Sequence, residues 1–383
     1  MSGNERNIMI IAGEVSGDLH GASLVDELKK IDKDLIIYGI GGDRMQQSGV
    51  KLIYHINKMA FLGFAEVIRH LPFIRRVQND LINIIKEKQI KNVILIDYPG
   101  FNLNFAKKIK PLKINILYYI SPQIWAWGAG RVKRIKNLVK KMFVVFPFEE
   151  KIYKDEGIPV EFVGHPLLER INRYNYLSEE EFYKKLELNK EKEILLIMPG
   201  SRKHEIEKIF PECIKAADRI SKEFDMQIVI ARASSIPGDS YEKLTPLRNF
   251  TVIEGYTYDL MRHSKLGIIK SGTSTLEAAL FALPMVIVYK TSLLTFLIGK
   301  NLINVKNIGM ANIISEEKVV QEFIQNDVKA EKIFNECKQM LSEQHLYDTI
   351  KAKLNTVKDK LGSIGASRRA AESIYAILNE AEA

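Results

Sequence analysis

Short apolar runs rich in β-branched residues alternate with longer amphipathic segments over most of the chain, and this alternation constrains the fold more than any other feature. Such runs are typical of strands buried on both faces of a parallel sheet, and the segments between them have helical spacing. The first half has predicted strands at 8–12, 35–38, 92–96, 114–120 and 142–145. The second half has predicted strands at 194–198, 227–231, 251–253, 266–269 and 285–288. The predicted helices lie at 19–30, 73–88, 101–110, 132–140, 206–224, 273–281 and 318–325.

Two consecutive blocks of this kind predict an α/β protein with two Rossmann-like domains that face each other across a cleft. The chain has 383 residues, which is longer than a domain with a single hydrophobic core usually is. We expect a first domain at 1–170, a second at 171–345, and a helical tail at 346–383 that packs back on the first domain or is exchanged in a dimer. Ligands of such sheets bind beyond the carboxyl ends of the strands, so the residues that follow each strand are the candidates for chemistry.

The chain contains 56 Lys and Arg against 47 Asp and Glu, a surplus compatible with nucleic acid, an anionic membrane surface or phosphorylated substrates. Its basic residues lack the interleaved aromatic residues of an RNA- or DNA-binding module, so no nucleic-acid partner is predicted. A hydrophobic content of 46% excludes a disordered chain, and two Cys exclude a disulfide scaffold. The first residues do not resemble a signal peptide, and no apolar stretch is long enough to span a membrane.

A glycine-rich turn follows the first predicted strand, in the segment that begins at Gly13. Main-chain N–H groups and a helix N-terminus at such a turn favour an anion, and Glu14, Ser16 and Gly17 are the candidate binding residues. A turn that is capped by its own Asp or Ser side chain explains the same composition equally well.

An acidic residue, Asp97, directly follows the predicted strand at 92–96. A carboxylate at the carboxyl end of a strand is well placed to take a proton from a substrate hydroxyl. The alternative is an N-cap for the helix at 101–110, a role that Asn102 would fill as well. Position alone does not separate these two interpretations.

Two turns in the second half also follow strands and open helices. Gly200, Ser201 and Arg202 offer main-chain N–H groups, a hydroxyl and a guanidinium, which suit a diphosphate. Ser271, Gly272 and Thr273 repeat the design, with Glu277 one turn inside the helix, where a carboxylate can accept two ribose hydroxyls. Each turn by itself is explained by capping; two of them in one half favour a nucleotide site.

No metal or other cofactor is predicted. The Asp32-Lys33-Asp34 triplet has the spacing by which some glycosyltransferases hold a divalent cation, but it precedes a strand and so lies at the opposite edge of the sheet. The His residues have no partners at metal-ligand spacing. Both tryptophans, Trp125 and Trp127, lie in one loop after a strand, where packing is the simplest explanation.

Eight segments, in order through both halves, together resemble the lipid-A-disaccharide synthases, bacterial enzymes of lipopolysaccharide biosynthesis. They are GEVSGDLHG at 13–21, GIGG at 39–42, the stretch 97–102, SPQIWAW at 121–127, FPFEEKIY at 146–153, VGHPL at 163–167, PGSR at 199–202 and SGTSTLE at 271–277. That family is similar to two-domain, metal-independent glycosyltransferases of the GT-B type.

The resemblance implies a reaction between two acylated sugars. The diacylglucosamine unit of UDP-2,3-diacylglucosamine would be transferred to 2,3-diacylglucosamine 1-phosphate, giving a β(1→6)-linked disaccharide 1-phosphate and UDP. An α-linked donor that gives a β linkage requires inversion, and hence one general base. The resemblance also implies a peripheral enzyme on the cytoplasmic face of the inner membrane, with a homodimer possible.

Family roles carry over where the motifs match. Asp97 corresponds to the carboxylate required for catalysis, Arg202 lies in the matching PGSR, and Glu277 lies in the matching SGT…E segment. Asn312 and Gln325 fall in a region that resembles the family's Pro-Asn-Leu segment and the helix after it, with Ala in place of Pro at 311.

Acylated substrates require a place where the protein meets lipid, and the stretch 59–76 mixes bulky apolar residues with a basic end. The expected membrane-contact residues are Phe61, Leu62, Phe64, Phe73 and Ile74. The alternative is that apolar residues three or four apart in this stretch form an ordinary core face.

Other functions remain open at this point. Another UDP-GlcNAc enzyme of the GT-B type, either a lipid-linked GlcNAc transferase or a UDP-GlcNAc 2-epimerase, is the alternative enzyme. A catalytically silent UDP-sugar-binding protein is the alternative of a different class, and the presence of Asp97 argues against it.

Overall fold

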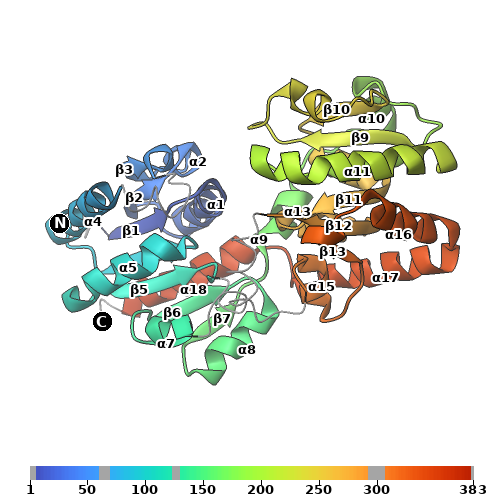
Figure 1. Ribbon diagram of the computed structural model, residues 1–383. Coiled ribbons are helices and arrows are strands. Elements are labelled where there is room, and N and C mark those ends of the chain that lie inside the picture. The colour runs from blue at the N-terminus through green and yellow to red at the C-terminus, as the bar shows by residue number, and fades with distance from the viewer. Residues whose placement is uncertain (1–5, 60–69, 123–129, 292–306, 381–383) are drawn as a thin grey trace. The chain divides into compact units, whose positions relative to one another are not determined.

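The computed structural model describes residues 6–59, 70–122, 130–291 and 307–380 (Figure 1). The chain divides into two compact units. Unit 1 comprises Met1–Glu169 together with Leu361–Ala383, and unit 2 comprises Arg170–Lys360. The second division therefore falls after Lys360 rather than after residue 345, and the last helix of the chain belongs to unit 1.

Unit 1 contains a seven-stranded sheet in which all neighbouring strands are parallel. The strand order is β3-β2-β1-β4-β5-β6-β7. The strands are β1 (Asn7–Ala12), β2 (Ile36–Gly41), β3 (Lys51–His55), β4 (Asn92–Ile96), β5 (Asn115–Tyr119), β6 (Lys141–Val144) and β7 (Val160–Phe162). The buried central strands match the predicted runs, whereas β3 and β7 at the two edges were not predicted, because their side chains are mostly half-exposed.

Helices on one face of the unit 1 sheet share a single core with it. This core joins side chains of β1, β4, β5 and β6 to those of α4 (Leu71–Glu87), α5 (Pro99–Ile109), α7 (Gly130–Lys136) and α8 (Pro147–Asp155). The helix α1 (Val15–Ile31) packs along α18 (Ala366–Glu380), so the end of the chain is part of the unit in which the chain begins. The short helix α2 (Asp43–Gln47) follows β2, and α9 (Pro166–Asn172) contains the division between the units.

Unit 2 contains a six-stranded parallel sheet in the order β10-β9-β8-β11-β12-β13. Its strands are β8 (Ile194–Met198), β9 (Gln227–Arg232), β10 (Phe250–Glu254), β11 (Ser264–Lys270), β12 (Met285–Tyr289) and β13 (Glu322–Ile324). Its helices are α10 (Glu179–Lys185), α11 (Lys203–Phe224), α12 (Thr257–His263), α13 (Thr273–Leu280), α15 (Met310–Ser315), α16 (Ala330–Ser342) and α17 (Gln344–Lys360).

The helix predicted at 318–325 is wrong. This segment contains the edge strand β13 and leads into a single 3-10 turn, Gln325–Asp327. Gln325 has φ 54, in the left-handed region, which a right-handed helix cannot accommodate. Gln325 therefore stands directly after a strand, at the carboxyl edge of the unit 2 sheet, in a 3-10 turn and not in an α-helix.

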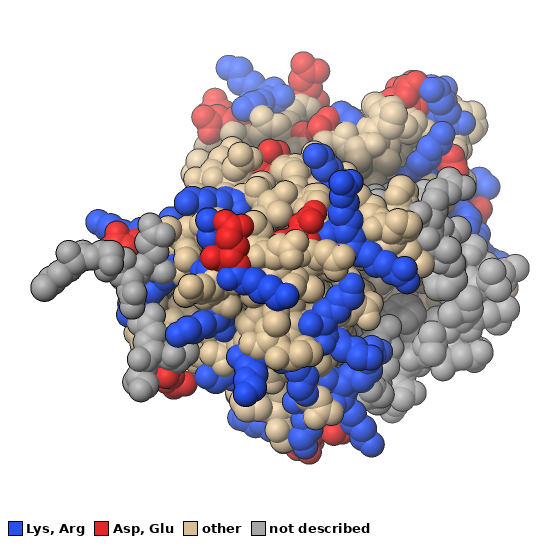
Figure 2. All heavy atoms as spheres, turned by 90° about the vertical axis from the view of Figure 1, so that its left-hand side faces the viewer, with Lys and Arg blue, Asp and Glu red and all other residues tan. Residues whose placement is uncertain are grey.

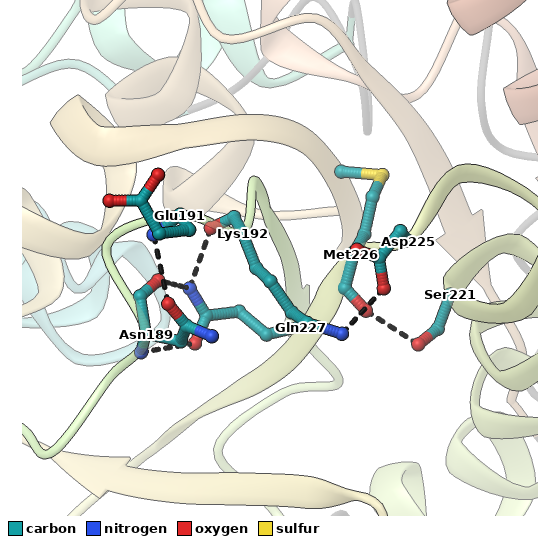
Figure 3. A network of polar contacts seen from close by, with 7 residues as sticks. All are labelled: Asn189, Glu191, Lys192, Ser221, Asp225, Met226 and Gln227. Carbon is teal, nitrogen blue, oxygen red and sulfur yellow. Dashed lines mark hydrogen bonds and ion pairs between the residues drawn. The ribbon is translucent and has the colours of Figure 1, made fainter.

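A polar network fastens the opposite, amino edge of the unit 2 sheet (Figure 3). Nε2 of Gln227, at the start of β9, donates hydrogen bonds to the carbonyl oxygens of Asn189 and Lys192 at 2.6 and 2.7 Å. Its Oε1 accepts from the main-chain N–H of Asn189 at 3.0 Å. These hydrogen bonds hold the loop before β8 against β9 at the amino edge of the sheet. The glycine-containing turns lie at the opposite, carboxyl edge.

Candidate active site

Asp97 and Glu14 lie at the same edge of the unit 1 sheet. Ala12 pairs with Ile96 where the neighbouring strands β1 and β4 end, so the residues that follow these strands come together. Burial raises the pKa of Asp97 to about 6, and the nearby Glu14 carboxylate contributes to the rise, while a main-chain hydrogen bond from Tyr98 opposes it. A carboxyl group with this pKa is mostly ionised at neutral pH and can accept a proton.

The main chain at Asp97 has an unusual conformation. Asp97 and Tyr98 have φ values of 43 and 47, both in the left-handed region, where each non-glycine residue costs about 1–3 kcal/mol. Gly13 permits this turn, because a Cβ there would lie 2.1 Å from Cδ1 of the Tyr98 ring. Two consecutive strained residues at the end of a strand are typical of a site whose geometry matters for function.

The N-cap interpretation of Asp97 is wrong. The N-cap of α5 is Tyr98, and the structure, over the residues it describes, has no side-chain capping bond there. Asn102 is not the cap either, because its Nδ2 donates to the carbonyl oxygens of Ile96 and Asp97 at 3.1 and 2.7 Å.

The turn after β1 divides into exposed and buried residues. Glu14 and Ser16 are exposed, whereas Gly17 is buried and a Cβ there would lie 3.2 Å from Cβ of Ala12. Glu14 and Ser16 therefore remain candidates for ligand binding, whereas Gly17 allows α1 to pack closely against the end of β1.

Asp18, which the sequence analysis did not select as a candidate, contacts the main chain at the end of the GIGG segment 39–42. Its carboxylate accepts hydrogen bonds from the main-chain N–H groups of Gly42, Met45 and Arg44 at 2.6, 3.0 and 3.3 Å. Asp18 therefore caps α2, and a Cβ at Gly42 would lie 2.7 Å from its Oδ2. The capping that was predicted for the turn after β1 exists, but it serves a different helix.

In unit 2, the two glycine-containing turns stand side by side. Met198 pairs with Ile269 near the ends of the neighbouring strands β8 and β11, so both turns lie at the carboxyl edge. Gly200 has φ 119, which L-residues rarely adopt. Ser201, Arg202 and Thr273 are exposed. These turns open α11 and α13 and present a guanidinium, two hydroxyls and two helix N-termini at one edge.

A charged group near these turns was missed from the sequence. Nζ of Lys270, the last residue of β11, lies 3.0 Å from Oε1 of Glu205, and Nη1 of Arg202 lies 3.8 Å from the same oxygen. Lys270 directly precedes the SGTSTLE segment at 271–277, and its position at the end of a strand was the signal that would have identified it.

Two of the expected binding residues, Ser271 and Glu277, are hydrogen-bonded within the protein. Ser271 is buried, and its Oγ donates to the carbonyl oxygen of Ile308 at 2.9 Å. Oε1 of Glu277 accepts from Tyr258 Oη at 3.0 Å and pairs with the guanidinium of Arg170. Neither Arg170 nor Tyr258 was predicted from the sequence.

Asn312 directs all its polar atoms into unit 2. Its Nδ2 donates to the Val320 carbonyl oxygen and to Glu322 Oε1, both at 2.8 Å, and its Oδ1 accepts the N–H groups of Val319 and Val320. This side chain, which is fully buried, holds α15 to the segment before β13 and has no capacity left for a ligand.

Gln325 differs from Asn312. Its Oε1 accepts from the N–H of Thr291 at 2.9 Å, while its buried Nε2 has no hydrogen-bond partner within the described part of the chain. A buried amide with a free N–H group costs free energy unless a ligand or water pairs with it. Gln325 is therefore the better ligand-binding candidate of the two.

The expected membrane segment is only partly described. Phe61, Leu62 and Phe64 lie outside the described residues, as do Trp125 and Trp127. Phe73 and Ile74 are half-buried on α4 and pack against the core of unit 1, although the sequence analysis expected them to contact the membrane. Lys and Arg are widespread on the face of the molecule that Figure 2 shows. On α4, Arg75 and Arg76 are exposed.

Among the helices that the structure describes, none has the length and apolarity needed to cross a bilayer. Within 6–59, 70–122, 130–291 and 307–380, no group of three or more His, Cys, Asp or Glu side chains is arranged to hold a metal ion.

Two parallel α/β sheets with helices after the second, and glycine-containing turns at their carboxyl edges, define the GT-B fold. Solved structures of this fold match nearly the whole chain. A glycosyltransferase of kitacinnamycin has a TM-score of 0.67 at 12% identity and covers 98% of this chain and 100% of its own. A UDP-N-acetylglucosamine 2-epimerase, described as putative, from Listeria monocytogenes has a TM-score of 0.68 at 13% identity, covering 98% and 97%.

Sequence relatives identify the family within this class. The lipid-A-disaccharide synthetase family model matches residues 8–377. The lipid-A-disaccharide synthase of Geobacter sulfurreducens is 41% identical over 376 residues, 97% of each chain, and that of Coxiella burnetii is 37% identical over 378 residues, 98% of this chain and 99% of the relative. The chain belongs to the lipid-A-disaccharide synthase family, as its motifs predicted, and it is an enzyme of lipid A biosynthesis. The epimerases share its fold, but their sequence identity to this chain is too low to indicate a shared function.

Proposed function

We propose that this enzyme joins UDP-2,3-diacylglucosamine to 2,3-diacylglucosamine 1-phosphate with inversion at the anomeric carbon, giving the β(1→6) disaccharide 1-phosphate and UDP. One observation carries the proposal: a half-buried carboxyl group, Asp97, stands in a strained turn at the carboxyl edge of the unit 1 sheet with its pKa raised to about 6. Family membership supports lipid A precursor sugars as the substrates.

The proposed chemistry is a single in-line displacement. The 6-hydroxyl oxygen of the acceptor attacks the anomeric carbon while its proton passes to the Asp97 carboxylate, and the bonding electrons of the C–O bond leave with UDP. A positioned general base contributes typically about 10²–10⁴-fold to the rate. Negative charge develops on the departing diphosphate, and Arg202 with the N-terminus of α11 would stabilise it.

The two units divide the substrates in this proposal. Unit 2 binds the UDP part, because the turns at 200–202 and 271–273, which suit a diphosphate, both lie in Arg170–Lys360. Unit 1 binds the acceptor at Asp97. Glu277 accepts the ribose hydroxyls through Oε2, since Arg170 and Tyr258 engage its Oε1. The Nε2 group of Gln325, which has no hydrogen-bond partner among the described residues, would donate to the nucleotide sugar.

The enzyme is proposed to act at the cytoplasmic face of the inner membrane as a peripheral protein, with Phe61, Leu62 and Phe64 of the stretch 59–76 in contact with lipid. A homodimer is proposed on family resemblance. Both substrates carry acyl chains, so a lipid-facing entrance is required by their chemistry.

The test is mass spectrometry of the products formed from the two acylated sugars, together with UDP release. We expect an acylated disaccharide monophosphate and one UDP for each molecule formed. Incubation of the enzyme with the donor alone distinguishes a transferase from an epimerase, because an epimerase would form an isomeric sugar nucleotide without any acceptor.

Asp97→Asn tests the role of the carboxylate. We expect turnover to fall by about 10²–10⁴-fold while the protein remains folded by circular dichroism. Asp26→Asn, an exposed acid on α1, is the matched control and should keep wild-type turnover. Near-normal turnover of folded Asp97→Asn would refute the proposed base.

A further inference from the structure

We propose that Asn102 and Tyr118 are positioning residues for the reaction, and that they act by fixing the main chain of Asp97. This proposal rests on the proposed function of Asp97 as the general base. Its carrying observation is that two side chains from different elements donate to the same main-chain oxygen, the carbonyl of Asp97.

The two donors approach this oxygen along different elements. Tyr118 lies on β5, the strand next to β4, and its Oη donates to the Asp97 carbonyl at 2.6 Å. Asn102 lies in α5, the helix that follows Asp97, and its Nδ2 donates to the same oxygen at 2.7 Å. The main-chain N–H of Asp97 donates to the carbonyl oxygen of Tyr119 at 3.1 Å, so the residue is held on both of its peptide groups.

Both donors are deeply buried. Asn102 and Tyr118 are 0% exposed, so neither group can exchange its hydrogen bond for one to bulk water. A buried amide or hydroxyl is retained only where it has a partner. The Asp97 carbonyl oxygen is the partner that the two side chains share, and Asn102 also donates to the Ile96 carbonyl oxygen at 3.1 Å.

The turn needs such restraint. Asp97 and Tyr98 both adopt left-handed φ, a conformation that persists only when the surrounding structure over-determines it. Loss of one donor lets the turn relax toward ordinary φ values, and the carboxylate then moves relative to an acceptor hydroxyl. A displacement of about 1 Å from a productive geometry costs up to about 100-fold in rate.

The residues also fit no simpler role in the described structure. Asn102 stands near the start of α5 but gives no capping bond to the helix, and Tyr118 directs its hydroxyl from β5 to the Asp97 carbonyl. Sequence reasoning assigned Asn102 only to helix capping and gave Tyr118 no role.

The experiment compares Tyr118→Phe and Asn102→Ala with Tyr119→Phe in the full-length enzyme. Tyr119 is the next residue on β5, is equally buried, and its Oη makes no hydrogen bond to Asp97 in the described structure, so it is a matched control. We expect kcat to fall about 10-fold in Tyr118→Phe and up to about 100-fold in Asn102→Ala, with KM for UDP-2,3-diacylglucosamine within about twofold. Tyr119→Phe should keep kcat within about twofold.

A double variant separates positioning from a general loss of stability. If Tyr118 acts through Asp97, then adding Tyr118→Phe to Asp97→Asn should change the residual kcat by less than about twofold. Full multiplication of the two effects, or wild-type kcat in both folded single variants, would overturn the proposal. If Asn102→Ala does not fold, the isosteric Tyr118→Phe still decides the matter.

Failure of the proposed function is recognised separately. Near-normal turnover of Asp97→Asn alone would show that the residue is not the base, and would end this proposal as well. Loss of turnover in Asp97→Asn with wild-type kcat in Tyr118→Phe and Asn102→Ala would end only the assignment of the two positioning residues.

Discussion

At the scale of single residues, the motif side chains divide into two groups that composition alone does not separate. Those left exposed at the strand ends are Glu14, Ser16, Ser201, Arg202 and Thr273. Those turned inward, which hold the main chain of the turns, are Asp18, Asn102, Ser271 and Asn312. A buried polar side chain must be hydrogen-bonded, and a short sequence motif does not show in which direction it points.

The pH dependence of turnover should report Asp97. Burial and the Glu14 carboxylate raise its pKa to about 6, and Tyr98 and Tyr118 are the other titratable side chains beside it. A base must be ionised, so kcat should be lost as the pH falls through about 6. Glu14→Gln removes a negative charge, lowers the pKa of Asp97, and should move this acidic limb to lower pH. The limb of the Asp26→Asn control should stay in place, and an unmoved limb in Glu14→Gln would contradict the coupling.

Glu277 should control UDP affinity. The carboxylate is ordered by Arg170 and Tyr258, and its Oε2 is proposed to accept ribose hydroxyls. We expect Glu277→Ala to weaken UDP binding by about 10- to 100-fold in calorimetry, the loss of a hydrogen bond to a charged group, with acceptor binding much less affected. Glu207→Ala, exposed on α11, is the control. Acceptor binding weakened more than UDP binding would reverse the assignment of the two units.

At the scale of elements, the strands that the sequence missed are the edge strands β3, β7 and β13. Central parallel strands are covered on both faces and read as continuous apolar runs, whereas an edge strand is short and partly exposed. The residues Val160–Phe162 of β7 are all half-exposed, so nothing in their pattern indicates a strand. Pairing with β6, which is a tertiary contact, makes them one.

Capping of α2 by Asp18 predicts a local stability effect. Asp18→Asn removes the charge from three hydrogen bonds to main-chain N–H groups, which we expect to lower the free energy of local unfolding by about 1–3 kcal/mol. Hydrogen exchange at the amides of Gly42, Arg44 and Met45 measures this directly. Asp43→Asn, whose side chain is 83% exposed in the same helix, should leave these exchange rates nearly unchanged. Unchanged exchange in Asp18→Asn would show that the cap contributes nothing.

At the scale of the whole molecule, the chain ends in the unit in which it begins. Glu169 Oε1 accepts from the N–H of Ser367 at 2.8 Å, and Arg369 Nε donates to the carbonyl oxygen of Val163 at 2.9 Å. These contacts join residues about 200 positions apart, so the sequence offers helical periodicity for the tail but no indication of where it packs.

Membrane contact is the property that the whole enzyme needs for acylated substrates. We expect the double variant Phe61→Ser with Leu62→Ser to be released from vesicles that contain anionic lipid and to show a raised KM for micellar acceptor, with UDP affinity unchanged. Phe73→Ser is the contrasting variant, since Phe73 packs against Tyr54 in unit 1 and its loss should reduce stability rather than membrane binding. A double variant that still sediments with vesicles would place the lipid contact elsewhere.

The sequence by itself determined the class of fold, the family, the central strands and the turns at which chemistry is proposed, because these depend on local periodicity and on motifs a few residues long. Only the tertiary structure decided which polar side chains face outward, where the edge strands pair and which unit holds α18. Those features arise from contacts between distant segments, such as Asp18 with Gly42, or Tyr118 with Asp97. The tertiary structure also decides the pKa of Asp97, because this pKa depends on burial and on the Glu14 carboxylate in the turn after β1.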